Sequence, residues 1–157
     1  MDKVLFINPI NIPFNDFINP AYRMVQKKNG KYGSVLTDMP LGILSMSAYI
    51  KKYHAVETKL IDFNVIMNEL EDFNFSSFRE FFRYYFSNLS TAGYIPDIIG
   101  ISTLFTPAYQ NTLDIGECCR DIFPDVVIIA GGGVPTNAYN EIFLDSLCFD
   151  ALCYGEG

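Results

Sequence analysis

The sequence predicts a doubly wound α/β fold, in which a five-stranded parallel sheet carries helices on both faces. First, short runs rich in Val, Ile, Leu and Phe are almost continuously apolar, which is typical of parallel strands buried on both sides. Second, longer stretches with helical spacing separate these runs, and such alternation produces right-handed crossovers within one sheet. Third, 157 residues, half of them hydrophobic, suffice for a single domain over residues 1–157 with a sizeable core.

Five segments are predicted as strands. Each is short and apolar, and polar or turn-forming residues bound it. The last of the five has the weakest pattern. The expected strands are VLFIN (4–8), KLIDF (59–63), DIIGIS (97–102), VVIIAG (126–131) and ALCYG (151–155).

Two predicted helices begin in the same way, with a polar cap followed by proline. Residues 38–53 have Asp38 or Thr37 as the cap, Pro40 in the first turn and lysines in the last turn, where cations suit the helix dipole. Residues 106–123 repeat the design with Thr106 as the cap.

A third predicted helix lies between residues 73 and 89. Phe78, Phe82, Tyr85 and Leu89 recur in it at spacings of four, three and four residues. Such an aromatic stripe could contact a cofactor or a partner. Burial in the core is favoured, because amphipathic helices ordinarily bury a stripe of this kind.

About thirty residues separate the first strand from the first of these helices. Most connections of this type are about 2–6 residues long, so residues 9–37 are expected to be either functional or poorly ordered. The segment is rich in Pro, Asn and Gly, and it follows a strand end. We predict a flap that orders over a ligand or a neighbouring domain, with protease cleavage near Lys27-Lys28 or Lys31.

Composition excludes several classes of function. The net charge of −7 and the lack of a basic run argue against nucleic acid as a partner. No apolar run reaches the length of a signal-peptide core or of a membrane span, so a cytoplasmic protein that does not enter membranes is expected. The four cysteines form no C-x-x-C pair and His54 is the single histidine, so reduced thiols are favoured over a zinc site or disulfides.

The unusual residues gather where the predicted strands end. In open parallel sheets, ligands bind beyond the carboxyl ends of the strands, beside the point where the strand order reverses. The third strand ends in a small hydroxyl, Ser102, which could bind a ligand or be satisfied by neighbouring backbone. The fourth ends in the triple glycine 131–133, which could form a ledge for a ligand or a tight turn with positive φ.

Familiar ligand motifs of α/β proteins are missing. The first strand leads into Asn8-Pro9-Ile10 and not into G-x-G-x-x-G, so Asp62 is interpreted as a strand-end acid and not as a ribose ligand. The chain has no P-loop and no acidic cluster of a phosphorylatable receiver. His54 falls in a turn at the opposite edge of the sheet, and no residue of this chain is predicted to be catalytic or to bind a metal.

GISTLFTPAYQN, followed about twenty-five residues later by IIAGGGVPT, is similar to the S-x-L…G-G pattern of cobalamin (vitamin B12)-binding domains. Six segments in order resemble, more closely, the N-terminal cobalamin-binding domain of radical S-adenosylmethionine enzymes. That class includes cobalamin-dependent methylases and the anaerobic magnesium-protoporphyrin monomethyl ester cyclase. The segments are VLFINP, PLGILSMSAYIKK, KLIDFN, PDIIGISTLFTPAYQNTL, IIAGGGVPT and GEG.

The resemblance implies a flavodoxin-like, Rossmann-like domain with cobalamin across the carboxyl edge of the sheet. Ser102 would bind the nitrogen of the dimethylbenzimidazole tail, and Leu104 would pack on the tail. The glycines would let the nucleotide approach the backbone, so that Gly132→Val would block binding and leave the fold intact. The cofactor-binding residues implied in this way are Ser102, Thr103, Leu104, Thr106, Gly131, Gly132, Gly133, Gly155 and Glu156.

Two departures from the family pattern limit what is carried over. The D-x-H-x-x-G segment with its cobalt-binding histidine is absent, so cobalamin is expected base-off and without a histidine ligand. The C-x-x-x-C-x-x-C run is also absent, so S-adenosylmethionine and the 4Fe–4S cluster are expected in a downstream radical domain. The chain is therefore expected to be the N-terminal domain of a larger enzyme, which would catalyse methyl transfer or cyclisation, or else a stand-alone remnant of one. The alternative is the same fold without cobalamin, acting as a substrate-binding or protein-interaction module.

Overall fold

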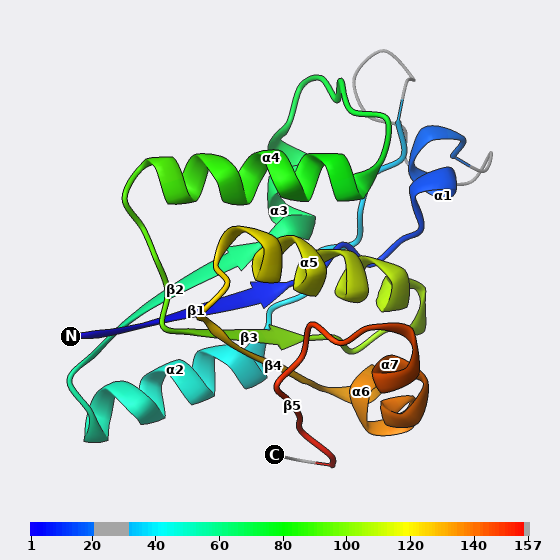
Figure 1. The fold of residues 1–157 in the computed structure, drawn as a ribbon. Helices are drawn as coiled ribbons and strands as arrows, with labels where there is room; N and C mark the ends of the chain where they lie inside the picture. Colours follow the sequence, from blue (N-terminus) through cyan, green and yellow to red (C-terminus); the bar gives the residue numbers. More distant parts are fainter. Residues whose placement is uncertain (21–31, 156–157) are drawn as a thin grey trace.

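The computed structural model of the chain describes residues 1–20 and 32–155, and within them strands and helices alternate as expected (Figure 1). The strands are β1 (Asp2–Asn8), β2 (Val56–Asp62), β3 (Ile98–Ser102), β4 (Val127–Gly131) and β5 (Ala151–Leu152). The helices are α1 (Phe14–Ile18), α2 (Leu41–Tyr53), α3 (Phe63–Glu69), α4 (Phe78–Thr91), α5 (Tyr109–Ile122), α6 (Gly133–Asn137) and α7 (Tyr139–Asp145).

All five strands are parallel, in the order β2-β1-β3-β4-β5. This confirms the doubly wound α/β fold and its flavodoxin-like strand order. The strand order reverses between β1 and β3, because the chain moves from β1 to β2 on one side and then returns to β3 on the other. Val4, Ile98 and Val127 are aligned across β1, β3 and β4, which fixes the register of the sheet centre.

Both predicted helix starts lie later than the sequence indicates. Helix α2 begins at Leu41 with Pro40 as its N-cap residue, and no side chain caps it; Asp38 accepts a hydrogen bond from the Met39 amide instead. Thr106 begins a short 3-10 turn (Thr106–Ala108) that precedes α5, and its side chain caps neither element.

One face of the sheet is covered by α3, α4 and α5 (Figure 1). The main core lies here, and apolar residues of β1, β3 and β4 pack against aromatic residues of α4. Phe78 and Phe82 are buried, while Tyr85 and Leu89 pack against the same core. The core interpretation of the aromatic stripe is therefore confirmed.

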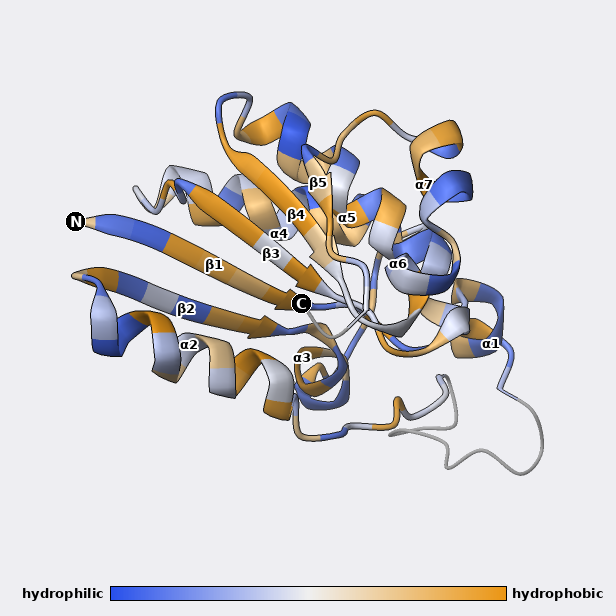
Figure 2. Cartoon of the chain, turned by 90° about the horizontal axis from the view of Figure 1, so that it is seen from below, coloured by the Kyte–Doolittle hydropathy of each residue, from blue (hydrophilic) through white to orange (hydrophobic). Residues whose placement is uncertain are grey.

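The other face carries α2 alone over β1 and β2. Ile43 of α2 is buried against Val4 and Phe6 of β1, and Ile50 and Ile98 complete this small cluster. Figure 2 shows this side with β3 and β4 uncovered, and much of their length is hydrophobic. Among the described residues, α6 contacts β4, which it directly follows in the chain, and Figure 2 shows no helix lying along the length of β3 and β4 on this side.

The long connection after β1 is expected from the sequence to be either functional or poorly ordered; several of its described residues pack against the core, whereas residues 36–39 are exposed. Phe17 is buried, and Tyr32 stacks on it with ring centroids 5.2 Å apart. The buried amide of Asn111 donates to the carbonyls of Ile10 and Ile12, at 2.8 and 2.9 Å. The expected cleavage sites at Lys27-Lys28 and Lys31 lie outside the described residues.

No helix within the described ranges 1–20 and 32–155 combines the length and the apolar character needed to cross a bilayer.

Candidate functional site

The carboxyl ends of the strands bring several of the predicted residues together. Ser102 ends β3 and is aligned with Gly131, which ends β4. Ser102 follows Gly100 and Ile98 in the alternation of β3, so its side chain is on the sheet face that carries α2. The site therefore lies beside the reversal point of the strand order, where α/β sheets commonly bind ligands.

The Ser102 hydroxyl is half-buried and has no hydrogen-bond partner among the residues that the structure describes. It lines a small cavity with about 70 Å³ of open space. The cavity lies between the end of β1, the start of α2 and the loop after β3. Its other lining residues are Asn8, Asn11, Asp38, Met39, Pro40, Leu41, Gly42, Ile43, Leu104 and Phe105.

Apolar side chains surround the entrance of this cavity. Leu104 is 62% exposed, and Phe105 and Met39 are also exposed. An aromatic ring could pack between them. A cavity of about 70 Å³ holds only one or two water molecules, so a benzimidazole ring enters only if these exposed side chains turn outward.

Thr103 has a different environment from its neighbour. It is buried, and its hydroxyl lies 2.8 Å from that of Thr112, which in turn donates to the Ala108 carbonyl. Its backbone amide donates to Gly131, and its carbonyl accepts from Val134. Thr103 thus joins the loops after β3 and β4, whereas Thr106 is exposed at the start of the 3-10 turn.

The three glycines contact the protein itself. Gly132 has φ of +101°, and a Cβ atom there would lie 2.6 Å from the Thr103 carbonyl oxygen. A Cβ on Gly133 would lie 3.1 Å from the Leu104 carbonyl oxygen, and one on Gly131 would lie 3.2 Å from Cys153. The glycines therefore allow the two loops to approach each other, and Gly132→Val is expected to disrupt the turn.

The last predicted residues of the site are only partly described. Gly155 has φ of +77° and is exposed, and its amide donates to the Thr136 hydroxyl over 3.1 Å. Glu156 lies outside the described residues.

Asp62 and His54 lie where the sequence predicts, at the end of β2 and in the turn after α2. Asp62 caps α3 by accepting from the amides of Asn64 and Val65, and it also accepts from the Asn8 side chain. His54 follows α2 and is exposed at the amino-terminal edge of the sheet. The part of the chain that the structure describes contains no group of three or more His, Cys, Asp or Glu residues that could hold a metal ion.

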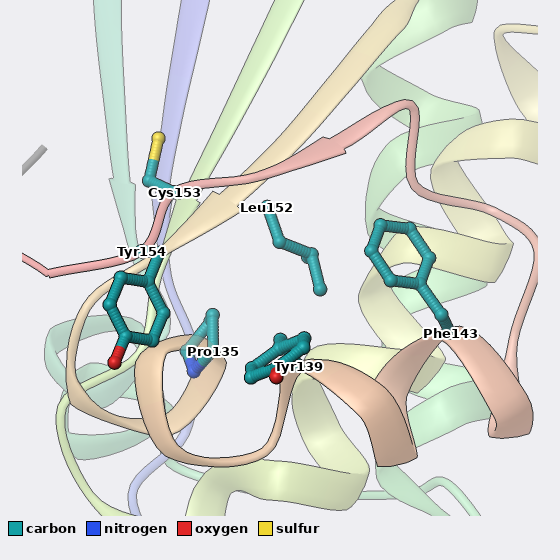
Figure 3. Close-up of a pocket in the computed structure, with 6 residues that line it drawn as sticks. All are labelled: Pro135, Tyr139, Phe143, Leu152, Cys153 and Tyr154. Carbon is teal, nitrogen blue, oxygen red and sulfur yellow. The ribbon is translucent and has the colours of Figure 1, made fainter.

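A second and larger cavity of about 330 Å³ lies between β5 and the helices α6 and α7 (Figure 3). None of the predicted site residues lines it. The spacing of Tyr139 and Phe143 on one helix face is the signal that could have indicated it. Its lining residues are Pro135, Tyr139, Phe143, Leu152, Cys153 and Tyr154.

The cysteines are free thiols that differ in exposure. Burial raises the pKa of Cys118 to about 11 and also raises the pKa of Cys119 and Cys148. A raised pKa lowers the thiolate fraction near neutral pH, which makes these three thiols poorer nucleophiles. Cys153 is exposed beside the second cavity.

Comparisons with known proteins give no match: no family model, no curated protein and no solved structure is similar enough to the chain to count as one.

Proposed function

We propose that this domain binds cobalamin in the base-off form, in which the benzimidazole tail is not a ligand of the cobalt. The observation that carries the proposal is the unpartnered Ser102 hydroxyl in a cavity beside the reversal point of the strand order. The hydroxyl is half-buried and can still reach water, so a ligand acceptor in the cavity would take the place of that water and accept a hydrogen bond from Ser102. The resemblance of the flanking segments to cobalamin-binding domains supplies the identity of that ligand.

The residues around the cavity would hold the tail once the exposed side chains at its rim turn outward to admit the ring. The Ser102 hydroxyl would donate a hydrogen bond to a ring nitrogen of the tail. Leu104 and Phe105 would pack on the ring and exclude water from the hydrogen bond. Gly132 and Thr103 would act indirectly, because they fix the loop that carries Leu104.

Bound cobalamin would supply methyl-transfer or electron-transfer chemistry at its cobalt. In the proposal, S-adenosylmethionine and a 4Fe–4S cluster belong to a neighbouring radical domain, which would be the catalytic partner. A cytoplasmic location is also part of the proposal, because free thiols persist in a reducing compartment.

Titration with hydroxocobalamin, followed by ultraviolet-visible absorption, tests the proposal. We expect saturable binding with a base-off spectrum. Ser102→Ala should weaken the affinity by about 5- to 150-fold. The ring nitrogen would be left without a hydrogen-bond donor, which costs about 1–3 kcal/mol of binding free energy. The matched control is Ser87→Ala, which removes an exposed hydroxyl on α4 and should leave the affinity unchanged.

His54→Ala provides a second control. The thirteen residues of α2 span about 20 Å, so His54 lies a helix length away from the carboxyl edge. The variant should therefore leave both the spectrum and the affinity unchanged. Absence of binding by the wild-type chain would overturn the proposal and leave the interaction-module alternative, and a spectral change in His54→Ala would place the site elsewhere.

A further inference from the structure

Helix α2 is apolar around most of its circumference, yet it buries little of that surface. Ile43 is its one fully buried residue, and Tyr49 is 64% exposed. Helices that are apolar on all sides are normally buried on all sides. The exposed apolar residues of α2 are Leu41, Leu44, Met46, Tyr49 and Tyr53.

The contacts of α2 show where its free side points. Ser47 bonds Thr58 of β2, with the two hydroxyl oxygens 2.8 Å apart, and Ile43 packs on β1. At 100° per residue, Met46, Tyr49 and Tyr53 lie on the flank turned away from β2. This flank therefore borders the uncovered half of the sheet (Figure 2).

The uncovered half of the sheet is apolar as well. Val127 is aligned with Ile98, and Ile129 is aligned with Gly100 and Ala151, so their side chains share the α2 side of the sheet. Val127 is 43% exposed, and Ile98 and Ile129 are half-buried. Parallel sheets are ordinarily covered on both faces, so this surface is suited to a helix lying beside α2.

We propose that a second copy of this chain covers this surface, with its α2 antiparallel to the first. The outer side of α2, opposite Ile43, presents Leu41, Ser45 and Ala48, with Lys52 at its C-terminal end. Apart from the terminal lysine, these side chains are apolar or small, so most of this side can approach the open strands of another copy closely. Each copy then supplies the helix that the other sheet lacks, as a two-fold axis requires.

The charges near the two ends of α2 favour the antiparallel pairing. Asp38 precedes the helix, and Lys51 and Lys52 occupy its last turn. In an antiparallel pair, the lysines of one copy lie near Asp38 of the other, and the helix dipoles are opposed. A parallel pair would instead bring the lysines of both copies together, which is unfavourable. The charge pattern thus makes this surface complementary to a second copy of itself in the antiparallel arrangement.

This proposal does not depend on cobalamin, and it is tested with the 157-residue chain alone. Sedimentation equilibrium over a range of concentrations should give a mass approaching twice the 17.8 kDa of one chain. Tyr49→Glu should raise the dissociation constant by about tenfold or more, because it buries a charge at the centre of the interface.

The matched control is Tyr84→Glu on α4. Both tyrosines are exposed on helices and each has one aromatic neighbour, Tyr53 for Tyr49 and Phe75 for Tyr84. Tyr84→Glu should leave the dissociation constant unchanged. Circular dichroism of both variants checks that they remain folded.

A charge exchange tests the antiparallel arrangement. Asp38→Lys alone and Lys52→Asp alone should each weaken association, and the two substitutions combined in one chain should restore it. A monomer at every concentration would overturn the proposal, as would a dimer equally weakened by Tyr84→Glu. A dimer weakened by Tyr49→Glu but not restored by the combined exchange would overturn the antiparallel pairing.

Discussion

The two faces of the sheet differ although the same strands form both. On the face under α3, α4 and α5, Ile99, Ile101 and Ile128 are at most 2% exposed. On the face under α2, Val127 is 43% exposed and Ile129 is half-buried, although both belong to β4, as Ile128 does. Consecutive residues of β4 thus have opposite environments, and the sequence of the strand alone does not distinguish them.

This difference separates the residues that hold the fold from those that are free to bind. The covered face contains the main aromatic and aliphatic core. The open face contains the Ser102 hydroxyl at its carboxyl edge and the exposed flank of α2 beside its centre. Both proposals made above therefore concern the open face, and neither requires a change in the covered face.

The largest expected effect concerns two neighbouring isoleucines. Ile128→Ala on the covered face should lower the free energy of unfolding by about 3–4 kcal/mol, because it leaves a cavity in a close-packed core. Ile129→Ala on the open face should cost about 1 kcal/mol, since its side chain is already partly in water. Urea denaturation of dilute protein measures both values.

Equal losses in the two variants would remove the distinction between the faces. Circular dichroism before denaturation should show the same helix content in both, so that the comparison is made between folded proteins.

A smaller effect is expected where the two loops meet at the carboxyl edge. Gly132→Ala should lower the free energy of unfolding by about 2–3 kcal/mol, because positive φ is unfavourable and its Cβ would approach the Thr103 carbonyl. Gly93→Ala is the matched control, with φ of +83° and no atom within 4 Å of the added Cβ. Gly93→Ala should lower the free energy of unfolding by about 1 kcal/mol. The same urea denaturation measures both variants.

If both glycine variants lose the same stability, the close approach of the two loops contributes nothing, and the glycines would again be free to serve a ligand.

The sequence predicts the five strands and the helices α2, α4 and α5 in their order, because strand and helix periods are local properties, whereas the short helices α1, α3, α6 and α7 are not predicted. The apolar runs give all five strands, although β5 shortens to Ala151–Leu152 and β2 begins three residues earlier than its apolar run. The helical spacing of Phe78 and Phe82 likewise predicts which side of α4 is buried.

Properties that depend on contacts between distant segments could not be predicted in this way. The burial of the connection after β1 depends on Asn111, which lies about a hundred residues further along the chain. The engagement of Thr103 with Thr112 depends on the packing of α5, and the role of Gly132 depends on the approach of a second loop. The uncovered half of the sheet could not be predicted either, because the sequence does not say which face of the sheet each helix covers.

The location of Ser102 was predictable because it follows from strand order and chain direction. Its lack of a partner was not, since a serine at a strand end commonly bonds neighbouring backbone. The cavity beside it also uses Met39 and Leu41, which no motif indicates.

The central claim is that the open face binds the ligand, and hydrogen–deuterium exchange with and without hydroxocobalamin tests it most directly. The account predicts slower exchange of backbone amides in residues 38–43 and 100–105 at saturating cobalamin, with α4 and α5 unchanged. Slower exchange confined to residues 135–154, around the second cavity, would contradict it, as would no change at either segment.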